Sequence, residues 1–357
     1  MIVIGVDTHK CTHALAAVDE GTGRSRGQLQ VEADEDGHLA AVRWAARLDG
    51  ERVWALEDCR GVSARLERAL VAAGERVVRV PPHRMGASRR AERERGKSDQ
   101  IDAHAIARAV VKDGADAFAP AHLDERALEI RLLCDHRTNL VAHRTKLQNR
   151  LRWQLVALCP ERERSIKRGG LSQTVVLERL DRALRAIGDT RARIARELIT
   201  QIRQHTRRIE ELHTQLTALV KHYCPRLLRE QGCGTVCAAL LIGHTAGAER
   251  FGRDGQFAMH AGVAPIPCSS GQRQKVYRLN RGGDRQLNHA LHIIAVTRAR
   301  TDPATRAYIE RKLAQGKTPK GALRCLKRHL ARHIHRLLTT PPTTQTSPAP
   351  PLMPCTQ

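Results

Sequence analysis

Short apolar segments alternate with helical patterns in the first quarter of the chain. Apolar runs bounded by turn residues predict strands at residues 2–6, 14–18, 28–31, 52–56 and 77–80. Apolar residues at helical spacing predict helices between the later runs, at residues 37–48 and 62–73. Three successive strands followed by strand–helix alternation are typical of an α/β domain.

The middle of the chain carries a heptad repeat. Its core positions are Leu198, Ile202, His205, Ile209, Leu212, Leu216 and Leu219. This spacing predicts a coiled coil, formed either as a hairpin within the chain or as a dimer. Residues 123–158 have leucines with basic residues between them and are the candidate antiparallel partner, across a break at Gly169 and Gly170. His205 is expected to set the register of the coil and not to bind a ligand.

The last third of the chain is predicted to be mostly α-helical. Residues 232–235 precede an apolar run and resemble a helix-hairpin-helix turn, whose backbone N–H groups can hold a phosphate. An ordinary loop with Thr235 as the helix N-cap explains the same residues equally well. Further helices are predicted at residues 284–300, 303–315 and 318–338. Proline and threonine dominate after Thr339, which predicts a disordered tail.

These patterns divide the chain into an α/β domain, a helical coiled-coil region, a mostly α-helical C-terminal domain and a tail. Their predicted bounds are residues 1–115, 123–225, 226–338 and 339–357. With 357 residues, of which 41% are hydrophobic, the chain has enough apolar side chains for more than one core.

The charge balance indicates a polyanionic partner. Lysine and arginine total 61 against 37 aspartate and glutamate residues, a formal charge of +24, and release of counterions drives such a protein onto nucleic acid. Aromatic residues make up 3% of the chain, so contacts to the nucleic-acid backbone are expected in preference to base stacking. Two basic clusters are predicted to contact phosphates, with a solvated helical face as the ordinary alternative. They are Arg89, Arg90, Arg93, Arg95 and Lys97, and then Arg281, Arg285, Arg324, Lys327 and Arg328.

The sequence gives no sign of export or membrane insertion. The N-terminus has no basic segment before an apolar run, and no apolar run approaches the roughly 18 residues that span a bilayer. The ten cysteines form no CxxC pair, and the spacings of cysteine and histidine give no four-ligand zinc set. We therefore expect a cytoplasmic, nucleoid-associated protein with no membrane partner and no structural zinc.

Four acidic residues stand at positions suited to metal binding. Asp7 and Glu57 end predicted strands, and Asp99 and Asp102 begin a predicted helix that Ser98 caps. Strand ends place side chains at one rim of a sheet, and the i, i+3 spacing puts the two aspartates on one helix face. Adjacent carboxylates repel each other unless a cation lies between them, and Mg²⁺ prefers carboxylate oxygens. The set therefore predicts two Mg²⁺ ions and two-metal phosphoryl transfer.

The segments around these acids resemble a known family. Residues 4–10, 56–58 and 96–103 are similar to the DEDD signature of the insertion-sequence transposases of the IS110 group. The resemblance implies a RuvC-like N-terminal domain with an RNase H-like fold. It also implies that the matching acids, Asp7, Glu57, Asp99 and Asp102, bind Mg²⁺. Asp58 is a neighbouring acid that competes with Glu57 for this assignment.

A second resemblance lies near the C-terminus. Residues 251–265, 269–271 and 280–287 are similar to the second domain of the same family, which supplies a nucleophilic serine just before a glycine. Ser270 matches that serine, and Ser269 is the alternative. The resemblance covers about residues 2–338 and implies Mg²⁺-dependent DNA strand exchange through a phosphoserine intermediate. It further implies a structured noncoding RNA that pairs with donor and target DNA.

Two other functions are weaker explanations of this sequence. Sugar kinases and chaperone ATPases share the superfold, but they need a glycine-rich phosphate loop that residues 7–10 lack. A decayed, DNA-binding scaffold would not need all four acids and the serine. Exchange of two strands requires at least two active sites, so with the coiled coil we expect a homodimer that pairs into a tetramer on DNA.

Overall fold

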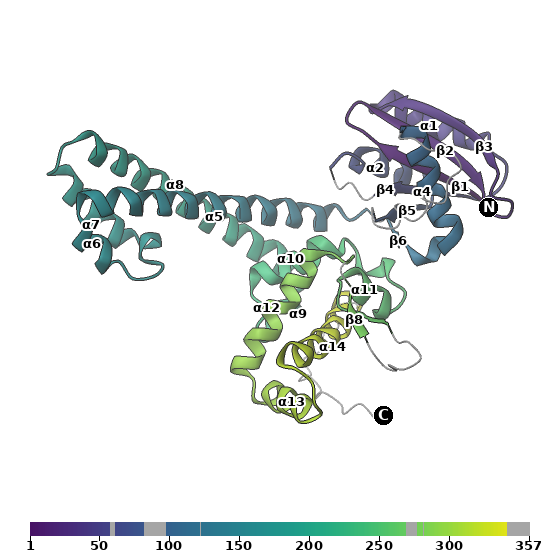
Figure 1. Cartoon of the computed structure of the whole chain (residues 1–357). Helices are drawn as coiled ribbons and strands as arrows, with labels where there is room; N and C mark the ends of the chain where they lie inside the picture. The colour runs from purple at the N-terminus through teal and green to yellow at the C-terminus, as the bar shows by residue number, and fades with distance from the viewer. Residues whose placement is uncertain (58–60, 82–97, 122, 269–276, 281, 341–357) are drawn as a thin grey trace.

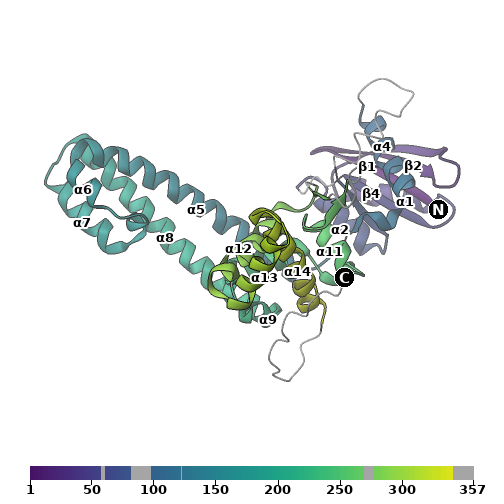
Figure 2. The same cartoon turned by 60° about the horizontal axis from the view of Figure 1, so that its bottom comes forward.

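The computed structural model describes residues 1–57, 61–81, 98–121, 123–268, 277–280 and 282–340. Figure 1 shows a sheet-containing region at the N-terminus, a long arm of two helices, and a helical region at the C-terminus. The arm extends away from the other two regions, which lie at its base in both views (Figures 1 and 2). Within the described part of the chain, no helix combines the length and the apolar character needed to cross a bilayer.

A mixed sheet organises the N-terminal region. Its strands lie in the order β3-β2-β1-β4-β5-β6, and β1 pairs antiparallel with β2 and parallel with β4. Their bounds are β1 Ile2–Thr8, β2 Thr12–Asp19, β3 Ser25–Glu32, β4 Arg52–Glu57, β5 Val77–Val80 and β6 Ala119–Pro120. This is the strand arrangement of an RNase H-like fold, and with the largely helical remainder it confirms the predicted fold class.

Helices cover both faces of this sheet. They are α1 Glu35–Ala46, α2 Ala64–Ala72 and α4 Asp99–Asp113, followed by the 3-10 turn η1 Ala115–Ala117. Because side chains alternate along a strand, Ile4 and Val6 of β1 pack on the α1 and α2 side with Trp54. Val3 packs on the opposite side, against Ile106 of α4. The odd-numbered residues of β1 therefore face α4.

Gly5 allows α4 to lie directly on β1. A Cβ atom at this position would be 2.0 Å from the carbonyl oxygen of Ala103, far inside van der Waals contact. Because glycine has no Cβ, the helix backbone can approach the strand this closely. The first turn of α4 is thereby brought to the end of β1, where Asp7 lies.

The arm is a hairpin within the chain. Helices α5 (Glu125–Leu158) and α8 (Thr190–Tyr223) run antiparallel, since Tyr223 bonds Asp124 at one end and Arg144 bonds Thr206 further along. Of the two predicted forms of the coiled coil, the structure has the hairpin. His205 packs edge-on against His143 of the opposite helix, with ring centroids 6.3 Å apart.

The tip of the arm has its own small core. The chain there forms α6 (Pro160–Ser165), the 3-10 turn η2 (Gly170–Ser172) and α7 (Thr174–Arg185). Leucines of α7 pack against the ends of α5 and α8. The break at Gly169 is present, with a left-handed backbone at φ 82°, but helix α7 was not predicted.

The C-terminal region packs around a buried helix, α10, together with the first turns of α5. The other elements are α9, the 3-10 turn η3, α11, the antiparallel strands β7 and β8, and α12 to α14. Their bounds are α9 Pro225–Arg229, α10 Thr235–Thr245, η3 Ala248–Arg250, α11 Asp254–His260, β7 Pro265–Pro267, β8 Tyr277–Leu279, α12 Arg285–Thr301, α13 Pro303–Ala314 and α14 Pro319–Thr339. The three last helices match the predicted ranges within two residues, whereas β7 and β8 were not predicted.

The turn before α10 differs from the predicted N-cap. Gly234, not Thr235, occupies the capping position, and Thr235 is the first residue of the helix. The Thr235 hydroxyl is instead 3.0 Å from the hydroxyl of Thr217 on α8. The threonine side chain thus ties α10 to the arm and does not cap its own helix.

Candidate active site

The sheet and helix α4 place the predicted acids at one rim. Asp7 lies near the end of β1 on the face covered by α4, and it is 4% exposed. Asp102, on the first turn of α4, is 5% exposed. Ser98 caps this helix, because its side chain accepts a hydrogen bond from the backbone N–H of Ile101. The positive end of the helix dipole therefore faces both aspartates of the first turn.

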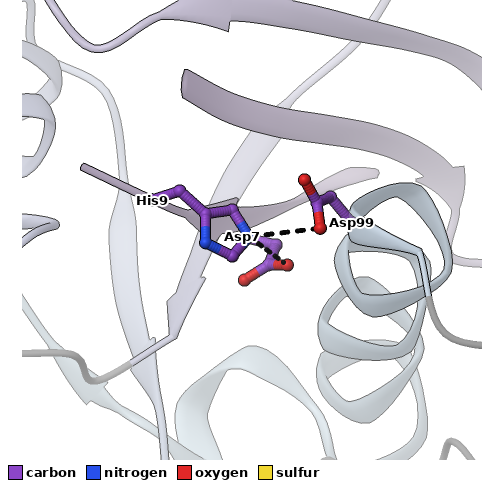
Figure 3. Close-up of side chains that lie close together, drawn as sticks. All are labelled: Asp7, His9 and Asp99. Atoms are coloured by element: carbon purple, nitrogen blue, oxygen red, sulfur yellow. Dashed lines mark hydrogen bonds and ion pairs between the residues drawn. The ribbon is translucent and has the colours of Figure 1, made fainter. Parts of the chain in front are cut away.

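His9 joins two of the acids. Its Nε2 lies 3.2 Å from Oδ2 of Asp7 and 3.3 Å from Oδ1 of Asp99, as Figure 3 shows. Ligand atoms of these three residues all lie within 4.8 Å of one another, a spacing that can hold a metal ion. His9 lies in the segment 4–10 that resembles the family signature, but it was not predicted to be a site residue. Its i+2 spacing from Asp7 at a strand end is the signal that was available.

The electrostatics of Asp7 reveal the other two acids nearby. Burial raises the pKa of Asp7, and a charge on His9 acts in the opposite direction. The charges of Asp102 and Glu57 raise this pKa further. Glu57 ends β4, the strand beside β1 in the sheet. The structure thus brings all four predicted acids to one rim, Asp99 through its contact with His9.

This arrangement fits a divalent cation. A buried carboxylate with two like charges nearby is held at a cost in free energy, and a cation among the oxygens removes the repulsion. The donors within 4.8 Å of one another are oxygens of Asp7 and Asp99 and a nitrogen of His9, a set that suits Mg²⁺ or Mn²⁺. An acidic site at Asp7 and Asp99 therefore indicates a divalent metal.

Several predicted site residues lie outside the described residues. They are Ser269, Ser270, Asp58, Arg281 and the first basic cluster, Arg89, Arg90, Arg93, Arg95 and Lys97. In the chain, the segment that contains both serines connects β7 to β8.

The remaining residues of the second basic cluster have contrasting surroundings. Arg285 is exposed at the start of α12. Lys327 is 9% exposed, and its ammonium group donates a hydrogen bond to Oδ1 of Asn288. Burial lowers the pKa of Lys327, and Arg324 lowers it further. A solvated helical face therefore does not describe Lys327.

The segment before α12 is fixed by Asp284. Its Oδ1 accepts hydrogen bonds from the backbone N–H groups of Gln286 and Leu287, so it caps the helix. Its Oδ2 lies 3.1 Å from Nδ1 of His244, and both side chains are buried. This pair anchors the end of the 280–287 segment to α10, within the core of the C-terminal region.

Two family models match this chain. A DEDD-type IS110 transposase model matches residues 4–160, and a transposase model of the IS116/IS110/IS902 family matches residues 224–310. The chain belongs to this family of insertion-sequence transposases. The first match spans the four acids of this transposase, and the second spans Ser270 and Asp284.

Relatives of the transposase include proteins of insertion elements from Streptomyces and Mycobacterium. An uncharacterized 44.8 kDa protein of IS116 from Streptomyces clavuligerus is 28% identical over 97% of this chain and 98% of its own length. An uncharacterized 42 kDa protein of IS900 from Mycobacterium paratuberculosis is 26% identical over 91% of this chain and 92% of its own. Among solved structures, Thermus thermophilus RuvC matches 34% of this chain at 19% identity, with a TM-score of 0.28.

Proposed function

We propose that this transposase cuts and rejoins DNA strands in a reaction that depends on Mg²⁺ and passes through a covalent phosphoserine. The convergence of Asp7, Glu57, Asp99 and Asp102 at one rim of the sheet carries this proposal. The resemblance of residues 269–271 to the serine segment of the family adds the nucleophile. We propose the domain division given by the sequence, 1–115, 123–225 and 226–338, for these parts.

The four carboxylates and His9 are the groups proposed to hold the metal, with two Mg²⁺ ions as the expected number. A divalent cation bound there would stabilise the charge that develops on the phosphate and on the leaving oxygen. The fold holds the carboxylates in position for the metal. Asp7 is fixed by burial in the sheet, while Asp99 and Asp102 are fixed by the first turn of a helix capped at Ser98.

Ser270 is the proposed nucleophile, with Ser269 as the alternative. Its Oγ forms a new ester bond to the phosphorus atom, and the bond from phosphorus to a deoxyribose oxygen breaks. The serine hydroxyl loses its proton, and the released deoxyribose hydroxyl gains one. Because one phosphoester replaces another, the bond energy is kept for rejoining. This favours strand exchange over hydrolysis.

The partners proposed are donor DNA, target DNA and a noncoding guide RNA. The charge of +24 supports a polyanionic partner, and the basic residues named in the sequence analysis are proposed to contact phosphates. We also propose a homodimer that pairs into a tetramer. The hairpin uses its heptad seam internally, so another surface must join the copies. Trp153 and Val156 of α5, which are 75% and 48% exposed and lie three residues apart on one helix face, support such a contact on the arm.

The decisive test is covalent capture of DNA. The full-length protein is incubated with a nicked substrate that carries the ends of the element, in Mg²⁺ or in EDTA, and protein–DNA adducts are resolved on denaturing gels. Wild type is expected to form an adduct in Mg²⁺ only, and Ser270→Ala is expected to form none. Ser269→Ala is the matched control and should retain it. An adduct with Ser270→Ala at the wild-type level would disprove the assignment, and loss with Ser269→Ala alone would move it to Ser269.

A further inference from the structure

A basic cavity lies in the C-terminal region, between the β7–β8 pair and helices α13 and α14. Its volume is about 400 Å³, within the range of about 300–1,000 Å³ that is typical of small-ligand sites. The basic side chains that line it are Arg278, Lys312, Lys317, Arg324, Lys327 and Arg328. No carboxylate from the described residues lines this cavity. Helices α13 and α14 belong to the region at the base of the arm, away from its tip (Figure 2).

Two of these cations are buried or half-buried, and neither has all of its donor groups satisfied by the described residues. Lys327 is 9% exposed, and its hydrogen-bond acceptor is the neutral amide of Asn288. Arg328 donates from Nη2 to Asp254 at 2.8 Å, but its buried Nη1 has no hydrogen-bond partner among the described residues. Bringing six like charges to one small volume costs free energy unless an anion neutralises them. The cavity is therefore built for an anionic ligand.

Aromatic and apolar groups complete the lining. The chain contains three tyrosines, and two of them, Tyr277 and Tyr308, line this cavity. Tyr277 is 57% exposed, so its ring is accessible. Arg311 and Lys312 lie over the ring of Tyr308, 5.5 and 5.7 Å from its centroid. Residues 263–265 form an apolar wall. A free phosphate needs neither rings nor an apolar wall, whereas a nucleotide carries a phosphate and a flat base together.

We propose that this cavity, the nucleotide pocket, binds one unpaired nucleotide of a DNA or RNA strand, with its phosphate among the basic side chains and its base against Tyr277. This proposal extends the proposed function. The biological role of the pocket rests on that function, because β7 and β8 come directly before and after the segment with the proposed serine in the chain. A nucleotide held beside β7 and β8 would separate the strand to be cut from its complement. Binding itself does not depend on the serine chemistry.

Photocrosslinking locates the base. A nine-residue oligothymidylate with one central 5-iodouracil is irradiated with the full-length protein, and the crosslinked peptide is identified by mass spectrometry. A ribonucleotide version of the same sequence forms the second arm and assigns the strand type. We expect the crosslink on Tyr277 or Tyr308, and Tyr277→Ala should lose it or move it to Tyr308. A crosslink confined to peptides outside residues 263–329 would overturn the proposal.

Affinity measurements test both halves of the recognition. Fluorescence anisotropy compares the oligothymidylate with one that carries an abasic site at its centre, and the abasic oligonucleotide should bind at least fivefold more weakly. Lys317→Gln should lower the slope of log affinity against log salt by about one. Lys320→Gln is its matched control. Lys320 lies three residues further along the same chain and is also exposed, but it does not line the pocket. Equal affinities for the two oligonucleotides, or equal slopes for the two lysine variants, would refute the pocket.

The outcomes of these experiments can be distinguished from the outcome of the serine test. If Tyr277→Ala loses the crosslink and still forms the Ser270-dependent adduct, the nucleotide pocket stands beside the proposed function. If the crosslink maps to the pocket and Ser270→Ala still forms the adduct, the pocket stands and the serine assignment falls. A melting temperature of Tyr277→Ala equal to that of wild type confirms that the lost crosslink does not reflect unfolding.

Discussion

Replacing Gly5 with alanine tests how the fold assembles the acidic site. The added Cβ would lie 2.0 Å from the carbonyl oxygen of Ala103 and 2.5 Å from the backbone nitrogen of Ala107. Both atoms belong to the backbone of α4, so no side-chain rotation relieves the clash. Ordinary contact begins at 3.4 Å, so α4 must move away from β1 by about 1.4 Å. Asp99 and Asp102 move with it, whereas Asp7 stays with the strand.

Two effects of different size are expected for Gly5→Ala. Overpacking of a core costs about 1–3 kcal/mol, and a clash with backbone belongs at the upper end, which lowers the melting temperature by more than about 5 °C. A shift of about 1 Å between catalytic groups costs about a hundredfold in rate. Strand-transfer activity should therefore fall by about this factor at a temperature where the variant is still folded.

The assays are thermal denaturation followed by circular dichroism, Mn²⁺ binding by calorimetry, and adduct formation with the nicked substrate. Gly21→Ala is the matched control, because a Cβ there would meet its nearest atom at 3.6 Å in a turn of the same sheet. If Gly5→Ala melts like Gly21→Ala and binds Mn²⁺ with wild-type affinity, the close packing of α4 on β1 does not position the site.

Three further predictions follow from single features of the structure. The pKa of Asp7 is raised in the folded protein, so the metal-free protein loses stability as pH rises through that pKa. The melting temperature of Asp7→Asn in EDTA at pH 7 should therefore be higher than that of wild type, and Mn²⁺ should not raise it further. Burial and the adjacent His38 lower the pKa of His13 from 6.5 to about 4, so about 3 kcal/mol of stability should be lost as pH falls from 6.5 to 4, and urea titrations of His13→Gln should show a flatter pH dependence. Arg250 donates to the carbonyl of Pro120 at 3.0 Å and to that of Thr245 at 2.9 Å; Arg250→Met should speed proteolysis between the sheet and the arm severalfold, and the exposed Arg253→Met should not.

The sequence alone determined the elements whose patterns are local. Strands β1 to β5, helix α4 with its Ser98 cap, and helices α12 to α14 follow from apolar periodicity and capping residues within each segment, whereas the two-residue strand β6 was not predicted. The four acids were also proposed from the sequence, because strand ends and helix starts place side chains at the rim of a sheet and because their segments resemble the DEDD signature. Helix α7 was missed because the glycine break before it was taken as the turn of the hairpin.

Tertiary structure decided every feature that joins residues distant in the chain. Periodicity predicts the apolar face of a helix but not the helix that packs on it, so the sequence could not distinguish a hairpin from a dimer. The contacts between α5 and α8 show that the seam forms a hairpin. The approach of His9 to Asp99 spans 90 residues and depends on Gly5, a position that local pattern marks only as a residue without a side chain. The basic cavity likewise gathers residues from 263 to 329, which become neighbours only when β8, α13 and α14 pack together. Residues that are neighbours in the sequence determine local structure. Sites that combine distant residues depend on which helix and sheet faces pack against one another.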